Sequence, residues 1–295
     1  MSTERRAGIA ALHSAFLSGE RRPSDHLAVC LDRIAQRNPE INAIVALCED
    51  RARREADASD ARFAAGQPLG PLDGITVGIK DTFDVLGLPT TFGSPLFKDN
   101  LPDRDCLSVE RLSHAGAVIV GKTNTSEFAA GAHTTNDLFG PTRNPWNTDL
   151  SPGGSTGGGA AGVADGMFDL ALGSDLGGSL RVPAAFCGVL GIRPTPGLVP
   201  KSPDTVPFDG MSIDGLIGRS ASDLAFGLDV VARPHPSDPK SPPADWQPRF
   251  AESLSAGSAQ IRSAAFLANF SSVPVSPDIL RICKSAVMNV VPEAD

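Results

Sequence analysis

Residues 171–183 read Ala171-Leu-Gly-Ser-Asp-Leu-Gly-Gly-Ser-Leu-Arg-Val-Pro183 and place Ser179 directly behind paired glycines. Glycines leave backbone N–H groups uncovered beside the serine hydroxyl, and this arrangement can serve a nucleophile and an oxyanion together. Two upstream segments add to it. They are Gly153-Gly-Ser-Thr-Gly-Gly-Gly159, whose Ser155 lies 24 residues before Ser179, and Gly78-Ile-Lys-Asp81, whose Lys80 lies 75 residues before Ser155. Two serines and one lysine in glycine-rich settings predict nucleophilic chemistry without a histidine.

Lys80 can act as a base only as a neutral amine. An ordinary lysine, with a pKa near 10.4, is neutral in only about 0.04% of molecules at pH 7, so Lys80 has to be desolvated. The apolar run 75–79 before it favours a strand that delivers the side chain into the interior. The alternative is a structural lysine that pairs with Asp81 or Asp84 at a strand end, and the pattern alone favours neither.

The other polar residues also have structural alternatives. The Ser155 hydroxyl would cap the helix that follows it, and Ser179 would cap the short segment 180–186. Asp175 and Arg181 would simply pair with each other. The number of glycines in this region argues against these interpretations, because glycine loses more conformational freedom on folding than any other residue. Only tight backbone geometry explains so many of them.

Two familiar motifs occur in the upstream glycine run. Residues 153–157 satisfy GxSxG, but a nucleophile elbow needs a strand directly before the serine, and residues 144–152 do not form one. His235 is the only histidine after Ser155 that could complete a hydrolase triad. Residues 157–162 satisfy GxGxxG, again without a preceding strand, and no Gly-Lys-Ser/Thr ending indicates a P-loop. An acyl-transfer site is therefore favoured over a nucleotide site.

Composition narrows the class of protein. The chain has 295 residues, is 41% hydrophobic and carries a formal net charge of −8 without a basic run. Nucleic acid and anionic membranes are therefore poor candidates as partners. No stretch reaches the roughly 18 apolar residues of a membrane span, and no export signal is expected at the start of the chain.

The cysteines are scattered without a CxxC or any metal-ligand spacing, so neither a zinc site nor a disulfide framework is predicted. Reduced thiols in a cytoplasmic protein fit best. We expect no cofactor and no metal. The five cysteines are Cys30, Cys48, Cys106, Cys187 and Cys283.

Hydrophobic periodicity predicts three helices in the first 65 residues, the third over 47–65, and then strands that alternate with helices. This order predicts an α/β fold, with 117–120 as a buried parallel strand. The predicted strands are 75–79, 117–120, 168–172 and 189–192, and the later helices are 105–115, 158–164 and 222–231.

Beyond residue 232 the composition changes. Residues 234–248 are rich in Pro, Ser and Asp and predict an exposed connection. After it we expect a strand at 261–267 and a helix at 277–290. The chain stops a few residues later, with no following strand for that helix to connect to, and we therefore expect it to be incomplete at its C-terminal end.

These residues resemble the amidase signature family. The spacings agree with the Ser-cisSer-Lys triad of that family, and the similarity extends from the N-terminal helices to about Ala232. The segments that carry it are Gly153-Gly-Ser-Thr-Gly-Gly-Gly-Ala-Ala161, Leu172-Gly-Ser-Asp-Leu-Gly-Gly-Ser-Leu-Arg-Val-Pro-Ala-Ala-Phe-Cys-Gly188, Gly121-Lys-Thr-Asn124, Phe139-Gly-Pro-Thr-Arg-Asn-Pro-Trp146 and Gly191-Ile-Arg-Pro-Thr195.

The resemblance implies a role for each matching residue. Ser179 would be the acyl-accepting nucleophile, Ser155 the bridging serine after a cis peptide, and Lys80 the base. The backbone N–H groups of Leu176, Gly177, Gly178 and Ser179 would form the oxyanion hole. Asp175, Arg181 and Thr156 would support the site. The implied fold is a mixed, largely central β-sheet covered by helices on both faces, in one domain divided into 1–65, 66–232, 233–258 and 259–295.

The implied reaction is hydrolysis of a small-molecule amide through an acyl-enzyme, and a homodimer is one assembly to consider. Two departures accompany it. Thr156, Gly159 and Gly191-Ile-Arg193 replace commoner residues of the family, and family members continue well past residue 295. Two alternatives therefore stay open. One is a glutamine-amidase subunit of a tRNA amidotransferase-like complex, and the other is a truncated, inactive fragment.

Overall fold

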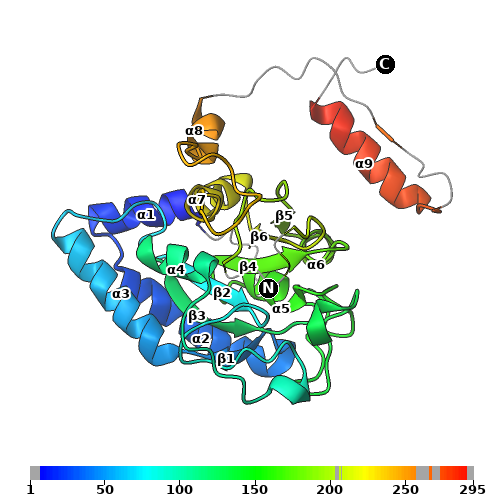
Figure 1. Cartoon of the computed structure of the whole chain (residues 1–295), viewed down its shortest axis with the longest axis horizontal. Coiled ribbons are helices and arrows are strands. Elements are labelled where there is room, and N and C mark those ends of the chain that lie inside the picture. The colour runs from blue at the N-terminus through cyan, green and yellow to red at the C-terminus, as the bar shows by residue number, and fades with distance from the viewer. Residues whose placement is uncertain (1–6, 203–205, 207, 257–265, 268–272, 291–295) are drawn as a thin grey trace. The chain divides into compact units, whose positions relative to one another are not determined.

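The computed structural model describes residues 7–202, 206, 208–256, 266–267 and 273–290 (Figure 1). The chain divides into two compact units, residues 1–251 and residues 252–295. The second unit contains the helix α9, Pro277–Val290, where a helix was predicted. The short helix α8, Phe250–Ser255, contains the boundary between the units. The strand expected at 261–267 falls outside the described residues, except for 266 and 267.

A mixed sheet of six strands forms the centre of the first unit, counted among its described residues. The order is β1-β3-β2-β4-β6-β5. β2 pairs in parallel with β3 and with β4, whereas β1, β6 and β5 join antiparallel. The strands are β1 Ile44–Leu47, β2 Thr76–Lys80, β3 Val118–Thr123, β4 Leu170–Asp175, β5 Leu190–Ile192 and β6 Ile213–Gly218.

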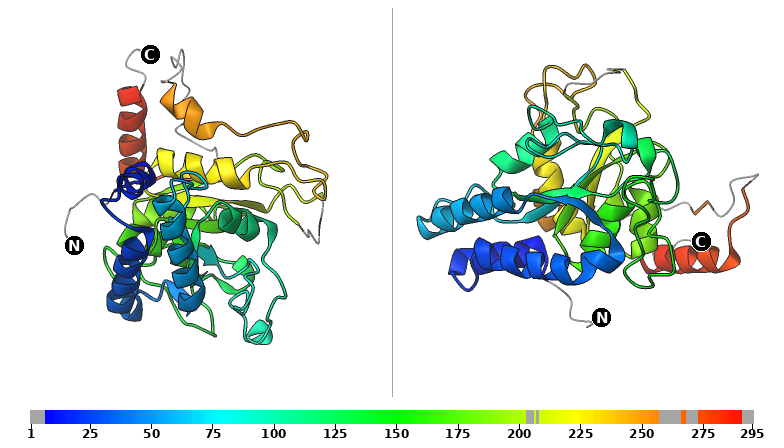
Figure 2. Two further views of the ribbon diagram at one scale, coloured as in Figure 1. Left: turned by 90° about the vertical axis from the view of Figure 1, so that its left-hand side faces the viewer. Right: turned by 90° about the horizontal axis from the view of Figure 1, so that it is seen from below.

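Helices cover both faces of this sheet (Figures 1 and 2). Side chains of one strand alternate between the faces, so Ile119 packs with α1, α4 and α7, whereas Val118 and Val120 pack with α2, α3 and α5. The expected helix-covered sheet is confirmed. The helices are α1 Ile9–Ser18, α2 Pro23–Ile41, α3 Glu49–Ala64, α4 Leu107–His114, α5 Gly157–Asp165, α6 Arg181–Cys187 and α7 Ala221–Val231, with short 3₁₀ turns at Pro95–Phe97 and Glu127–Ala129.

Two strands were missed by the sequence analysis. The first 65 residues were expected to be helical, but β1 lies among them and pairs with β3, so the third helix begins at Glu49 rather than at 47. β6 contains an aspartate and two glycines and has little strand propensity of its own. It forms because it pairs with β4 on one side and with β5 on the other. A glycine is needed at position 215, since a Cβ there would lie 2.3 Å from the Ile192 carbonyl oxygen.

The start of α5 lies against backbone, and this contact gives a test of the fold. A Cβ on Gly158 would lie 2.5 Å from the Asn124 nitrogen and 2.6 Å from the Ala43 oxygen, two backbone atoms that cannot rotate away. Gly158→Ala should therefore lower the free energy of unfolding by about 1–3 kcal/mol in urea titrations. Gly210→Ala, where no atom lies within 4 Å of the added Cβ, should not. Equal stability of the two variants would contradict this packing.

Candidate active site

Lys80 is the last residue of β2, and its side chain is fully buried. Its Nζ donates to the Ser155 Oγ at 2.7 Å and to the Ser174 Oγ at 3.1 Å. Within the part of the chain that the structure describes, Lys80 makes no ion pair. Asp81 instead pairs with Lys122, whose Nζ lies 2.8 Å from the Asp81 Oδ1. The structural alternative for Lys80, a pair with Asp81 or Asp84, is therefore wrong.

The surroundings of Lys80 favour the neutral amine that a base requires. Burial lowers its pKa to about 7, and the charges of Asp214 and Asp175 offset part of that effect by favouring the ammonium form. A lysine with a pKa near 7 is about half neutral at pH 7. The ordinary obstacle to lysine as a base is therefore largely removed by desolvation.

Ser155 lies in the glycine run 153–159, two residues before α5 begins. The Gly154–Ser155 peptide bond is cis, as the resemblance implied. A Cβ on Gly154 would lie 2.9 Å from backbone atoms of His133, so only glycine fits at this approach. The N-cap of α5 is Thr156, with no side-chain capping bond. The Ser155 hydroxyl therefore does not cap the helix, and it faces Lys80 instead.

Ser179 lies in the loop between β4 and α6 and is half-buried. Its carbonyl accepts a hydrogen bond from the Thr156 N–H at 3.2 Å, which ties the two glycine-rich segments together beside Ser155. The N-cap of α6 is Leu180, again without a side-chain capping bond. The alternative in which the Ser179 hydroxyl caps the next helix is therefore wrong.

Asp175 holds the loop in place from the end of β4. Its buried carboxylate accepts from the Gly178 N–H at 2.8 Å and from the Leu180 N–H at 3.2 Å, and it pairs with the Arg181 guanidinium at 2.9 Å. Burial alone would raise the pKa of Asp175, but the Arg181 guanidinium and these N–H groups together lower it. The pairing of Asp175 with Arg181, given above as a structural alternative, is present, and their supporting role in the site stays a prediction.

This network bears on the four N–H groups predicted as oxyanion donors, which stay a prediction. The Gly178 N–H donates to the Asp175 carboxylate at 2.8 Å in the structure. The N–H groups of Leu176, Gly177 and Ser179 have no acceptor among the described residues. Leu176 and Gly177 are exposed, so these donors border a surface that a substrate can reach.

Thr156 packs at the base of the site. Its Oγ1 donates to the Ser174 carbonyl at 3.4 Å, and a Cβ on Gly173 would lie 2.5 Å from its methyl group. Thr156 thus connects the start of α5 with β4. The contact is structural and does not involve Lys80.

Ser174 and Asp214 were missed by the sequence analysis. Ser174 lies in the segment 171–183, two residues after the end of the strand predicted at 168–172. That position could have indicated a residue of the site. Asp214 gave no signal, because β6 was not recognised. It becomes a neighbour of the site only because β6 pairs with β4, where Asp214 lies directly opposite Ser174.

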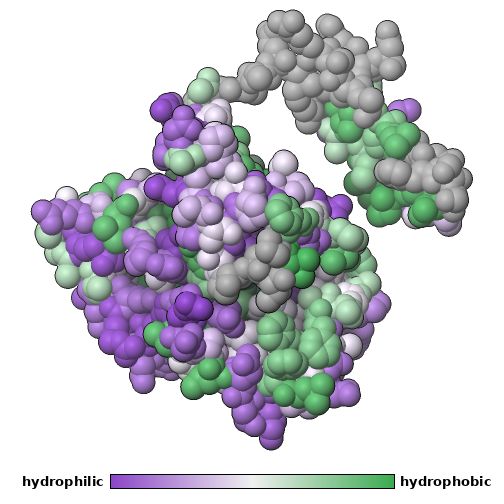
Figure 3. All heavy atoms as spheres, viewed as in Figure 1, coloured by the Kyte–Doolittle hydropathy of each residue, from purple (hydrophilic) through white to green (hydrophobic). Residues whose placement is uncertain are grey.

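Apolar side chains are exposed near the loop that carries Ser179. Leu176 is 57% exposed, and Phe186 of α6 and Trp146 are also exposed. The Trp146 Nε1 donates to the Cys187 carbonyl at 2.7 Å, which holds the indole against the end of α6. Hydrophobic residues gather on part of the face shown in Figure 3, among hydrophilic ones.

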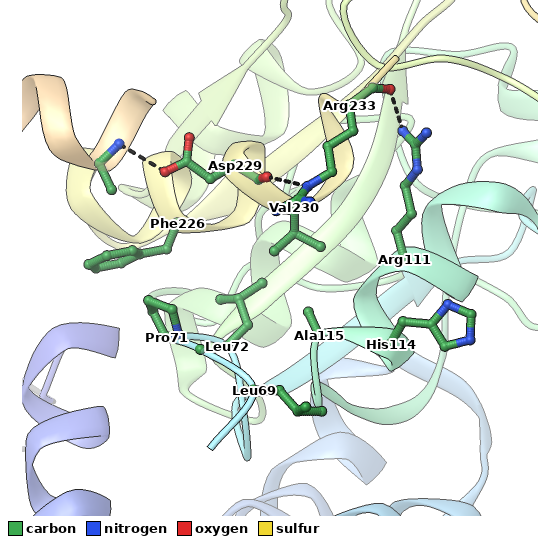
Figure 4. Close-up of a pocket in the computed structure, with 12 residues that line it drawn as sticks. Leu69, Pro71, Leu72, Arg111, His114, Ala115, Phe226, Asp229, Val230 and Arg233 are labelled. Atoms are coloured by element: carbon green, nitrogen blue, oxygen red, sulfur yellow. Dashed lines mark hydrogen bonds between the residues drawn. The ribbon is translucent and has the colours of Figure 1, made fainter. Parts of the chain in front are cut away.

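A cavity of about 440 Å³ lies away from these residues, between α4, α7 and the loop 69–72 (Figure 4). Its polar lining groups already have partners. The Arg111 guanidinium donates to the carbonyls of Val231, Arg233 and Pro234, and the Asp229 carboxylate accepts two backbone N–H groups. The cavity therefore contributes nothing to the chemistry around Lys80.

Other kinds of site find no support among the residues that the structure describes. No group of three or more His, Cys, Asp or Glu side chains there is placed to hold a metal ion. None of the helices in the described ranges has the length and apolar character needed to span a bilayer. All five cysteines are free.

Comparison with known proteins identifies the family of this chain. Residues 25–291 match the family model Amidase. The chain is 43% identical over 233 residues to a glutamyl-tRNA(Gln) amidotransferase subunit of Synechococcus sp. (strain RCC307), and the match covers 79% of this chain and 48% of that protein. This chain therefore belongs to the amidase signature family.

Two solved structures are similar over nearly the whole chain. A bacterial aryl acylamidase of the amidase signature family superposes with a TM-score of 0.88 at 29% identity, and 6-aminohexanoate cyclic dimer hydrolase with a TM-score of 0.88 at 31% identity. Each comparison covers 98% of this chain and 60% of the other. The chain thus spans about half the length of its curated relative and three fifths of these two structures.

Proposed function

We propose that this chain hydrolyses the C–N bond of a small carboxylic amide through an acyl-enzyme on Ser179. The observation that carries the proposal is the buried Lys80 Nζ, which lies 2.7 Å from the Ser155 Oγ and has no ion-pair partner among the described residues. A buried lysine that were merely structural would need a carboxylate, as Lys122 has. Membership of the amidase signature family supports the same reaction.

The proposed steps move one proton along three residues. Neutral Lys80 takes the proton of the Ser155 hydroxyl while Ser155 takes that of Ser179, and the Ser179 Oγ attacks the amide carbonyl carbon. The tetrahedral oxyanion accepts hydrogen bonds from the N–H groups of Leu176, Gly177 and Ser179. As the C–N bond breaks, the proton returns through Ser155 to the leaving nitrogen. A water molecule then gives a proton along the same path and attacks the carbonyl carbon of the acyl-enzyme. The proton returns through Ser155 to the Ser179 Oγ as that C–O bond breaks, and the acid is released.

A mass measurement tests this function directly. Treatment with a fluorophosphonate should add one phosphonyl group to the wild-type protein, because only an activated serine displaces fluoride readily. Ser179→Ala should show no adduct, whereas Ser18→Ala, which removes an exposed hydroxyl at the end of α1, should keep it. Intact-mass spectrometry reads both results. A folded wild-type protein that gains no adduct would contradict the proposal and favour the inactive-fragment alternative.

A second candidate function rests on the 43% identity to a glutamyl-tRNA(Gln) amidotransferase subunit. In that case the amide would be glutamine, and the chain would work with partner subunits rather than as a homodimer. Release of ammonia from glutamine only after such partners are added would favour this candidate. Hydrolysis of simple amides by the chain alone, at the same rate as with the partners, would count against it.

The five free cysteines support placing either enzyme in a reducing cytoplasm.

A further inference from the structure

A carboxylate lies behind the hydroxyl that holds Lys80. Asp214 of β6 pairs directly with Ser174 of β4 in the antiparallel ladder. Side chains at opposite positions of such a ladder lie on one face, with Cβ atoms roughly 4.5–5.5 Å apart. Since the Ser174 Oγ accepts a hydrogen bond from the Lys80 Nζ, Asp214 neighbours the group that holds the lysine. Asp214 is itself only 7% exposed.

A second lysine approaches Asp214 from the loop before β6. The Lys201 Nζ lies 3.6 Å from the Asp214 Oδ1 and donates to the Ser212 carbonyl at 2.8 Å. The Lys201 backbone N–H donates to the Asp238 carboxylate at 3.0 Å, which fixes the start of this side chain. Lys201 is thus held where its charge partly compensates that of Asp214.

We propose that Asp214 and Lys201 together set the fraction of Lys80 that is neutral at a given pH. The Asp214 carboxylate stabilises the Lys80 ammonium form, and the Lys201 ammonium group weakens that effect. Both act through space and through Ser174, so they are positioning residues and touch no substrate. The catalytic meaning of the pair rests on the proposed function, whereas its effect on Lys80 does not.

Two other carboxylates near Lys80 have cationic partners. Asp175 is balanced by Arg181 and by Arg193, whose Nε lies 3.7 Å from the Asp175 Oδ1. On β2 and β3, Asp81 is balanced by Lys122.

At the start of α4, burial and the neighbouring carboxylates of Asp214 and Asp84 raise the pKa of the Cys106 thiol to about 12. That thiol is therefore uncharged at neutral pH.

The sign of each effect follows from electrostatics. Burial and the surrounding charges together give Lys80 a pKa of about 7. Asp214→Asn removes the charge that favours the ammonium form and should lower the pKa of Lys80 by about one unit. Lys201→Met removes the charge that weakens this effect and should raise the pKa of Lys80 by about half a unit. A merely structural pair would not shift the titration in opposite directions.

The experiment is an NMR titration of the Lys80 side chain in the whole chain, with ¹³C-labelled lysine and Lys80→Arg to assign the signal. The matched controls are Asp99→Asn and Lys98→Met, because Lys98 and Asp99 form an exposed pair at 3.8 Å. The controls should leave the Lys80 titration unchanged. Where Asp214→Asn does not fold, Lys201→Met and Lys201→Gln still test the sign.

Opposite shifts of the Lys80 titration in the two variants would support the proposal. No shift, or shifts in the same direction, would overturn it. The low-pH limb of kcat/KM for amide hydrolysis should move with the titration, because the enzyme gains activity as Lys80 loses its proton. Opposite shifts in a protein that forms no serine adduct would leave this inference standing and refute only the proposed hydrolysis.

Discussion

Replacing Lys80 with methionine should lower kcat/KM for a simple amide by at least about 10³-fold while the protein stays folded. The substitution removes the group that takes the proton from Ser155, so Ser179 loses its route to activation. It also replaces a desolvated amine, which makes no ion pair among the described residues, with an apolar side chain of similar length. We therefore expect unchanged or greater stability in urea titrations.

Lys122 is the matched control, because it is the other fully buried lysine of the sheet. Lys122→Met strands the Asp81 carboxylate that it pairs with at 2.8 Å, and removing one partner of a buried pair costs about 3–5 kcal/mol of stability. The two substitutions should thus separate activity from stability. A Lys80→Met protein that hydrolyses amides at the wild-type rate would rule out Lys80 as the base. One that unfolds as readily as Lys122→Met would contradict the conclusion that Lys80 is buried without an ion pair.

Asp169→Asn should lower the free energy of unfolding by about 3–5 kcal/mol at pH 6. The buried Asp169 carboxylate joins α2 to the sheet, because it accepts from the His26 Nε2 at 2.7 Å, the Thr76 Oγ1 at 2.7 Å and an Arg219 Nη2 at 2.9 Å. An asparagine leaves two cations without their anion. Urea unfolding of the purified variant measures the loss.

The pH dependence of this effect has a definite sign. Burial alone would lower the pKa of His26, but the Asp169 carboxylate raises it to about 10, above the value near 6.5 in the unfolded chain. The contribution of His26 is therefore complete below about pH 6.5 and is lost as the pH rises toward 10. His26 and Arg219 hold the pKa of Asp169 below its usual range, so its contribution is present above about pH 4 and lost in acid.

The deficit of Asp169→Asn should accordingly be larger at pH 6 than at pH 9. Asp103→Asn, which breaks an exposed pair with Arg104 at 3.8 Å, should leave the unfolding midpoint unchanged at both values. A deficit that stays the same at pH 6 and pH 9 would show that Asp169 does not raise the pKa of His26.

Most of the fold could be predicted from local pattern. Short, mostly apolar runs located β2 and β3, and periodicity located the helices α4 and α7, to within a few residues. The two strands are buried along their whole length, and the two helices bury one face. β1 and β6 could not be found in this way. Their strand conformation comes from pairing with β3, β4 and β5, which lie far away in the sequence.

The candidate site was likewise predicted only in part from the sequence. The glycine spacing identified Lys80, Ser155 and Ser179, since few other roles require so much uncovered backbone beside hydroxyl groups. The sequence could not distinguish a free lysine from a paired one, because Asp81 is adjacent along the chain. The structure shows which lysine is paired, because Lys122 of β3 forms the ion pair with Asp81, the residue that follows β2.

Motifs and their spacing thus predicted a lysine and two serines held by glycines, and they indicated the family to which the chain belongs. The three-dimensional arrangement was needed to show that the Gly178 N–H donates to Asp175, that Asp214 lies opposite Ser174, and that Lys201 approaches Asp214. The physical reason is that local conformation follows from side-chain size and hydrophobicity along the chain. Protonation and donor availability depend on burial and on charges that distant strands bring together.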